Sequence, residues 1–165
     1  GPIVEYPIAQ LVVREGKLFL LPTWLYEAME TLKDMKRVYA HVKKLKELVD
    51  SGKIAREVHE DVLRTYIGGA FSALDKAEKM KKTIAKNLEE LNQRIKEEKE
   101  MVIDMAVKRI LEDVDMKEYV KEIERMRELR KLRNMQLNDL KTVLDELDKT
   151  LKGIYKCVFP EESGI

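Results

Sequence analysis

Histidine and cysteine, which often carry catalysis or bind metals, are rare in this sequence and do not cluster. The chain has two histidines, His41 and His59, and a single cysteine, Cys157. His59-Glu60 lacks a second histidine four residues after the first, so the helical zinc signature is absent. Cys157 has no second cysteine with which to form a redox or zinc pair, and a chain with one cysteine favours a reducing compartment. The sequence predicts no catalytic or metal site, no cofactor and no small-molecule substrate.

Carboxylate pairs and phosphate-binding motifs lead to the same conclusion. Pairs such as Glu97-Glu98 are expected by chance in a chain with 31 acidic residues and indicate a solvated helix face. The glycine fingerprint of dinucleotide-binding folds, the P-loop and the nucleophile elbow of serine hydrolases do not occur. We therefore expect a protein that is not an enzyme and that acts by binding other molecules.

Two clusters of basic residues remain as candidates for binding chemistry. The first cluster comprises Lys79, Lys81, Lys82 and Lys86 and is expected to contact anionic lipid or DNA. The alternative is that these lysines only form a solvated helix face. The second lies within residues 125–133, where Arg130 or Arg133 is expected to face Glu98 and to fix the register of a helix pair. Because Lys+Arg 32 nearly cancels Asp+Glu 31, bulk charge does not favour nucleic-acid binding.

Long helices must position these side chains. No glycine or proline occurs from Ala70 to Lys152, charged residues make up 38% of the chain and aromatic residues only 6%. A β-sandwich or a Rossmann domain needs turn residues about every ten positions, so both are excluded. High charge with few aromatic residues is typical of coiled coils. No run of 18 apolar residues is present, so no membrane-spanning helix is expected.

Apolar periodicity divides the helical region into three. The first helix is expected to begin at Thr23, as its cap, and to end at Gly52 in a left-handed cap. The second covers residues 55–112 and would be about 87 Å long. A register shift and a capping residue, Asp115, favour a turn before the third helix over one continuous helix. The third helix is expected to end at or shortly after Gly153.

The seams of these helices indicate coiled-coil packing, either within one chain or between two chains of a homodimer. The seam positions are Leu74, Ile84, Leu88, Leu91, Ile95, Val102, Ile123, Leu137, Leu140, Leu144 and Leu147. Gly68-Gly69 interrupts the second helix at a propensity cost of about 2 kcal/mol, and is expected to permit close helix approach or a bend. The predicted fold class is mainly α: an elongated antiparallel coiled coil of about three long helices with a small N-terminal β-hairpin.

The remaining boundaries follow from composition. Gly1-Pro2 is interpreted as a cloning scar. Residues 3–21 place β-branched and apolar residues on both sides of a short turn, which predicts a hairpin or the last strands of a larger β-unit. Residues 22–155 form the helical coiled coil, and residues 156–165 are expected to be a flexible tail.

One stretch carries a family resemblance. Residues 16–28 read G-K-L-x-x-L-P-x-W-x-Y-E-A, and a hairpin loop at residues 51–54 precedes the long charged coiled coil. This arrangement resembles the archaeal cell-division family CdvA, whose members have a PRC-barrel before a coiled coil. The resemblance implies that residues 3–21 are the last strands of the barrel and that residues 24–155 are the coiled coil.

The resemblance also implies a function. Members of that family dimerise through the coiled coil, assemble into filaments, associate with membrane and with DNA, and recruit an ESCRT-III-like protein. It implies a location in the cytoplasm, at the inner face of the membrane at the division site. Recruitment uses a C-terminal segment that adds as a strand to the partner's winged-helix domain, and the matching residues here are Ile154, Tyr155, Val158 and Phe159. A generic coiled-coil adaptor or stalk protein and a DNA-organising coiled coil are the alternatives.

Overall fold

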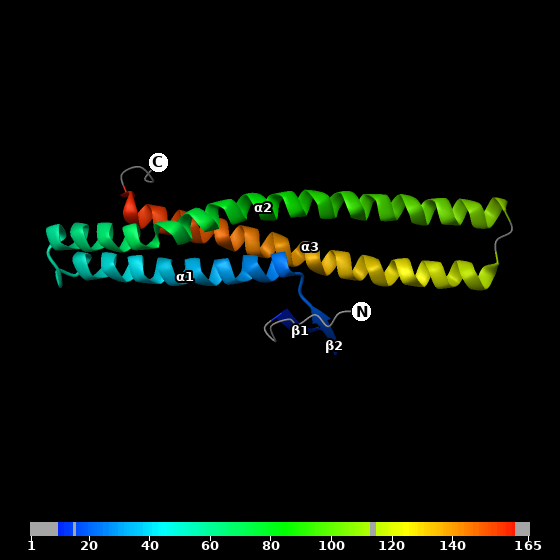
Figure 1. Ribbon diagram of the computed structural model, residues 1–165, viewed down its shortest axis with the longest axis horizontal. Helices are drawn as coiled ribbons and strands as arrows, with labels where there is room; N and C mark the ends of the chain where they lie inside the picture. The colour runs from blue at the N-terminus through cyan, green and yellow to red at the C-terminus, as the bar shows by residue number, and fades with distance from the viewer. Residues whose placement is uncertain (1–9, 15, 113–114, 161–165) are drawn as a thin grey trace. The chain divides into compact units, whose positions relative to one another are not determined.

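The computed structural model describes residues 10–14, 16–112 and 115–160, and Figure 1 follows their path. The elements are β1 (Leu11–Arg14), β2 (Lys17–Leu20), α1 (Thr23–Asp50), α2 (Arg56–Leu111) and α3 (Met116–Val158). The predicted class, three long helices with a small antiparallel hairpin, is confirmed. The chain forms two compact units. The first comprises the residues up to Lys81 and those from Asp145, and the second comprises Lys82–Leu144.

The β-hairpin pairs its strands in a register that runs from Leu11 opposite Leu20 to Arg14 opposite Lys17. Gly16 in the turn has φ +74, a conformation that L side chains rarely adopt. Beyond the strands, the Leu21 N–H donates to the backbone oxygen of Gln10 at 2.7 Å. Residues 1–9, with the expected scar and the earlier part of the strand region, lie outside the described residues.

The first helix, α1, starts one residue differently from the expectation. Pro22 is the N-cap, and its carbonyl oxygen accepts the N–H of Tyr26 at 3.0 Å. No side chain caps this end, so the prediction that Thr23 is the cap is wrong. Thr23 already belongs to the first turn because the extended backbone of Pro22 (φ −54, ψ 144) precedes it. Proline suits this boundary because it has no N–H to leave unpaired.

The C-terminus of α1 is confirmed as predicted. Gly52 adopts φ +73, and its N–H donates to the carbonyl of Val49 at 3.1 Å. The N–H of Lys53 donates to the carbonyl of Leu48 at 2.9 Å. These two bonds form a Schellman motif, which satisfies carbonyls at the end of the helix. The chain then turns within a few residues and α2 begins at Arg56.

The first unit is a three-helix packing of α1, the N-terminal part of α2 and the C-terminal part of α3. Each helix buries a stripe of apolar residues spaced three or four apart: Leu25, Ala28, Leu32, Met35, Val38, Val42, Leu74, Ala77, Leu147, Leu151 and Ile154. The packing of α3 on α1 is close at Gly153, where an added Cβ would lie 2.7 Å from the Tyr39 Cε2. Lys36 Nζ also bonds Glu146 of α3 at 3.1 Å.

The second unit is a helical hairpin. α2 ends at Leu111 and α3 begins at Met116, which confirms the predicted turn. Asp115 caps α3, because its Oδ1 accepts the backbone N–H of Lys117 at 3.2 Å. The hairpin buries Ile84, Leu91, Met126, Leu140 and Val143. Two helices alone cannot bury all of their apolar residues. The exposed apolar side chains of this unit are more frequent near the turn than elsewhere in it.

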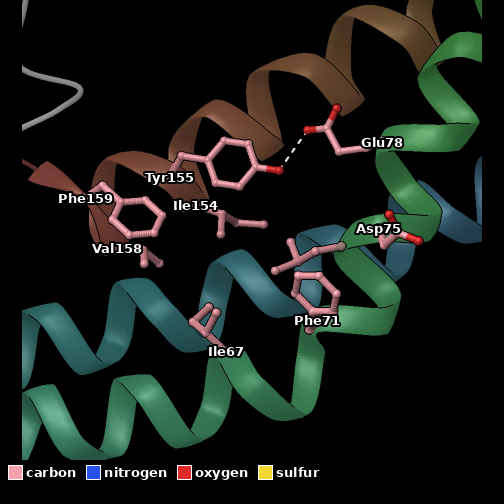
Figure 2. Close-up of a pocket in the computed structure, with 9 residues that line it drawn as sticks. Ile67, Phe71, Asp75, Glu78, Ile154, Tyr155, Val158 and Phe159 are labelled. Atoms are coloured by element: carbon pink, nitrogen blue, oxygen red, sulfur yellow. Dashed lines mark hydrogen bonds between the residues drawn. The ribbon is translucent and has the colours of Figure 1, made fainter.

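Gly68 and Gly69 in α2 were expected to permit either the close approach of another helix or a bend, and the structure supports the bend. An ideal Cβ at Gly68 or Gly69 would meet no atom of another segment within 4 Å. On the side to which these glycines would direct a side chain, no other described segment therefore approaches α2 closely. Figure 2 shows α2 changing direction between the labelled residues Ile67 and Asp75, so the glycines lie at a bend.

Candidate interaction surfaces

Three of the four C-terminal residues expected to bind a partner as a strand, Ile154, Tyr155 and Val158, are helical, and Phe159 follows the end of α3. α3 continues to Val158, five residues beyond Gly153, and Ile154 is fully buried. The reason is that Leu147, Leu151 and Ile154 extend the apolar stripe, so burial continues the helix past the glycine. The prediction of a flexible tail is thus wrong for residues 156–158. Residues 161–165 lie outside the described residues.

The same residues line an apolar groove. It has a volume of about 260 Å³ between α2 and the last turn of α3 and is lined by Ile67, Phe71, Leu74, Asp75, Glu78, Ile154, Tyr155, Val158 and Phe159 (Figure 2). A second hollow of about 410 Å³ shares Ile67, Val158 and Phe159 with it and extends to Glu60. The two hollows are therefore adjacent.

Two phenylalanines make this groove unusual for a chain that contains only three. Phe71 is 67% exposed and Phe159 is 50% exposed, and both line the groove. Exposed aromatic side chains beside an apolar hollow are typical of a surface that takes up side chains from a partner. Sequence reasoning identified Phe159 but missed Phe71, because Phe71 lies outside the heptad seam.

A hydrogen bond forms the polar wall of the groove. The Tyr155 hydroxyl donates to Glu78 Oε1 at 2.7 Å and links α3 to α2 (Figure 2). Burial, followed by the hydrogen bond and the negative charge of Glu78, raises the pKa of Tyr155 to about 12. Tyr155 therefore remains a protonated donor at neutral pH, and it helps to hold the end of α3 in place.

The predicted lysine cluster is partly neutralised. Lys79 Nζ lies 2.9 Å from Asp75 Oδ2, and Lys81 Nζ lies 2.9 Å from Asp148 Oδ1 on α3. Hydrogen bonds from Lys152 and then Lys81 hold the pKa of Asp148 below its ordinary value. Lys81 consequently joins α2 to α3, and an external ligand would have to compete with Asp148 for it. The other two lysines of the cluster, Lys82 and Lys86, are exposed.

The polar contact expected in the seam is present. Arg133 Nε lies 3.1 Å from Glu98 Oε1, with both side chains largely buried between α2 and α3. Arg130, the other expected partner, is exposed. Because a buried charge needs its partner, this pair favours one register of the second unit over its neighbours.

The seam residues lie in contacts within the chain. Leu74, Ile84, Leu91, Leu140 and Leu147 are buried. The others are partly buried: Leu88, Ile95, Val102, Ile123, Leu137 and Leu144. Substitutions at the buried positions would therefore affect the folding of a single chain before any contact with a second chain.

An exposed apolar surface lies instead near the turn of the second unit. We call it the hairpin-end surface, and it comprises Met101, Ile103, Val107, Ile110, Leu111, Met116 and Val120. Ile110 is 80% exposed and Leu111 is 76% exposed. On α2, Ile103, Val107 and Ile110 are spaced four and three residues apart and so lie on one face. An apolar helical face of this kind is typical of a surface that packs against another helix.

The histidines and the cysteine form no cluster. The His41 Nδ1 lies 2.8 Å from the Tyr66 hydroxyl, and their rings meet edge to face. Cys157 is a free, partly buried thiol. Among the described residues, no three His, Cys, Asp or Glu side chains are grouped so as to hold a metal ion. Within the same residues, no helix is long and apolar enough to cross a membrane.

The helical packing, the heptad seams and the buried polar pair define a coiled-coil protein. A comparison with known protein families matches residues 23–158 to the CdvA-like coiled-coil domain. The chain therefore belongs to the CdvA-like coiled-coil family, a structural family related to cell division. Searches of curated proteins and of solved structures found no match.

Proposed function

We propose that this protein is a non-enzymatic scaffold of archaeal ESCRT-type cell division. It dimerises, assembles into filaments and recruits an ESCRT-III-like partner to the inner face of the membrane at the division site. Family membership over residues 23–158 is the observation that carries this proposal. Two surfaces of the structure supply the contacts that such a scaffold needs.

The first contact is self-association through the hairpin-end surface. Its side chains remain largely exposed although the rest of the second unit buries its apolar stripe. Covering them with the same surface of a second chain would bury apolar area at about 25 cal/mol per Å². A two-fold contact of this kind is self-complementary and gives a homodimer.

Light scattering during size-exclusion chromatography tests this contact. The wild-type chain of 19.3 kDa should elute with about twice that mass. The double variant Ile110→Asp, Leu111→Asp should elute as a monomer with unchanged helix content. Val13→Asp is the matched control, because Val13 is also exposed and apolar but lies in the β-hairpin, and this variant should remain dimeric. A dimer that persists in the double variant would exclude the hairpin-end surface.

The second contact is recruitment through the C-terminal groove. Strand addition by residues 154–159 would require the last turn of α3 to unwind and Ile154 to leave the core. Docking of a partner segment into the groove requires neither change, since Phe71 and Phe159 are already exposed. The groove is therefore the better-supported binding mode for the ESCRT-III-like partner.

Calorimetric titration with the winged-helix domain of the ESCRT-III-like partner tests recruitment. Phe71→Ser and Phe159→Ser should each weaken binding at least tenfold, as expected for aromatic anchor residues. Leu18→Ser, which removes an exposed apolar side chain from the β-hairpin, should leave the affinity unchanged. Loss of binding only in Phe159→Ser would instead support strand addition by the tail. Absence of binding by the wild-type chain would refute recruitment.

A further inference from the structure

The helices α1 and α2 extend beyond the part of α3 that packs on them. α3 ends at Val158, and Val158 and Phe159 lie beside Ile67 of α2, since all three line both hollows. From Ile67 back to its first residue, Arg56, α2 continues for about 11 residues, which is about 16 Å. Figure 1 shows α1 and α2 running past the end of α3. We call this part of the two helices, residues 43–67, the α1–α2 overhang.

The burial of the apolar stripes falls where α3 ends. Val42 of α1 and Leu74 of α2 are buried in the part of the unit that α3 covers. The same stripes continue into the overhang with helical spacing, and their members there are only partly buried: Leu45, Val49, Leu63 and Ile67. Two helices without a third leave one side of their seam uncovered. The overhang therefore lacks the layer that α3 supplies to the rest of the unit.

The hollow of about 410 Å³ lies next to the end of α3, along the overhang part of α2. Its lining residues come from these two segments: Glu60, Leu63, Arg64, Ile67, Val158 and Phe159. Because Val158 and Phe159 also line the groove beside α3, the surface on which α3 packs continues into this hollow. An amphipathic helix packs on the first part of that surface, so a second amphipathic helix suits its continuation.

Two charged side chains of the hollow are available to a ligand. Glu60 and Arg64 are exposed, and neither forms an ion pair with another residue in the part of the chain that the structure describes. They are four residues apart on α2 and so lie on the same side of the helix. A segment that covers the apolar floor between them would pair both if it carried a basic residue beside Glu60 and an acidic residue beside Arg64.

We propose that the α1–α2 overhang is the docking site for an amphipathic helix of a partner protein, about three turns long, which continues the path of α3. The apolar residues of this helix cover Leu63 and Ile67, and its charged residues face Glu60 and Arg64. The inference rests on the proposed recruitment only for the identity of the partner, and it adds the form of the segment that the partner inserts. A helix in this place leaves α3 intact, whereas strand addition by residues 154–159 does not.

An extension of α3 within the full chain tests whether the overhang accepts a helix. Residues 160–165 are replaced by a segment of about 11 residues made of alanine, lysine and glutamate, with leucines that continue the stripe of Ile154 and Val158. The segment omits Pro160, because proline inside a helix breaks it. Burial of the leucines should raise the midpoint of urea unfolding by about 1 M or more. A control extension of the same composition, with its leucines on the opposite side, should leave the midpoint near that of the wild type.

Fluorescence anisotropy with the same segment as a labelled synthetic peptide tests docking between molecules. The wild-type chain should bind the peptide, and Leu63→Ser and Ile67→Ser should each weaken binding at least tenfold. Val58→Ser is the matched control, because Val58 is an exposed apolar residue of α2 that lines neither hollow, and it should leave the affinity unchanged. The chain with the aligned extension should not bind the peptide, because its overhang is already covered.

Three results would overturn the proposal. The first is an aligned extension that stabilises the chain no more than its control does. The second is a peptide that does not bind the wild-type chain, or that binds the Leu63→Ser and Ile67→Ser chains as tightly. The third is an equal loss of binding in Val58→Ser. Should Leu63→Ser or Ile67→Ser unfold, the extension decides, because it leaves the residues of the overhang unchanged.

Titration with the winged-helix domain separates this inference from the proposed recruitment. If the wild-type chain and the chain with the aligned extension bind that domain equally well, recruitment stands and docking of the partner at the overhang is refuted. If the extension and the peptide behave as expected but the wild-type chain does not bind the domain, the docking site stands and recruitment of the ESCRT-III-like partner is refuted.

Discussion

Gly153 is expected to be required for the close packing of α3 on α1. An added Cβ at Gly153 would lie 2.7 Å from Tyr39 Cε2 and 3.0 Å from Tyr39 Cζ. Real Cβ contacts are essentially never this short, so either the tyrosine ring or the helix must move. Overpacking of this kind costs about 1–3 kcal/mol. Alanine also has a higher helix propensity than glycine, which offsets about 1 kcal/mol of that cost. Gly153→Ala should therefore destabilise the chain by about 1 kcal/mol.

The same substitution at two other helical glycines provides a matched control. Gly68 and Gly69 are exposed, and an added Cβ at either would meet no atom of another segment within 4 Å. Only the propensity gain remains there, so Gly68→Ala and Gly69→Ala should each stabilise the chain by up to about 1 kcal/mol. The difference between Gly153→Ala and either control should be about 2 kcal/mol.

Urea unfolding followed by far-ultraviolet circular dichroism measures these differences. The same substitution in a Tyr39→Ala variant separates the steric clash with the tyrosine ring from other effects. Because the ring is absent there, Gly153→Ala should stabilise that variant by about 1 kcal/mol. If Gly153→Ala stabilises the wild-type chain as much as Gly68→Ala does, α3 does not approach α1 as closely as the structure shows, and the reasoning fails.

Three further predictions concern individual contacts. Arg133→Met leaves Glu98 unpaired and should lower the free energy of unfolding in urea by about 1–3 kcal/mol. Adding Glu98→Leu should restore most of that loss. A double variant as unstable as the single variant would contradict this prediction. Leu140→Ala should cost about 2–5 kcal/mol in the same assay, because Leu140 is fully buried, and a cost below about 1 kcal/mol would not fit that burial. Tyr155→Phe should cost about 1–2 kcal/mol at neutral pH by removing the donor to Glu78. The pKa of Tyr155 in the folded chain, about 12, lies above the ordinary tyrosine value of 10.0, so this contribution is complete below about pH 10 and is lost as pH rises through about 12. Unfolding curves of both chains across that range should converge, and a constant gap would contradict the assignment.

The sequence by itself determined the helices and most of their ends. The short joint after Gly52, the three–four apolar spacing and the register shift before Asp115 predicted α2 within one residue at each end, residues 55–112 against Arg56–Leu111. Gly52 and Asp115 act at helix ends as expected, because capping depends on the few residues around it. Counting outward from the turn placed Glu98 opposite Arg130 or Arg133, since a short turn fixes which residues of an antiparallel pair are opposite, and the structure pairs it with Arg133.

Only the tertiary structure decided which side chains make contacts within the chain and which remain exposed and available to bind other molecules. The sequence predicts a coiled coil to residue 155, whereas α3 continues to Val158 beyond the buried Ile154. Lys81 is held by Asp148 of another helix, whereas Lys33 and Lys43 have no ion-pair partner among the described residues. The groove at Phe71 is formed by α2 together with the end of α3, two segments far apart in the sequence. Apolar periodicity depends on residues that are neighbours in the sequence. The neutralisation of a charged side chain and the exposure of an apolar one depend on residues from distant segments, which come together only in the folded chain.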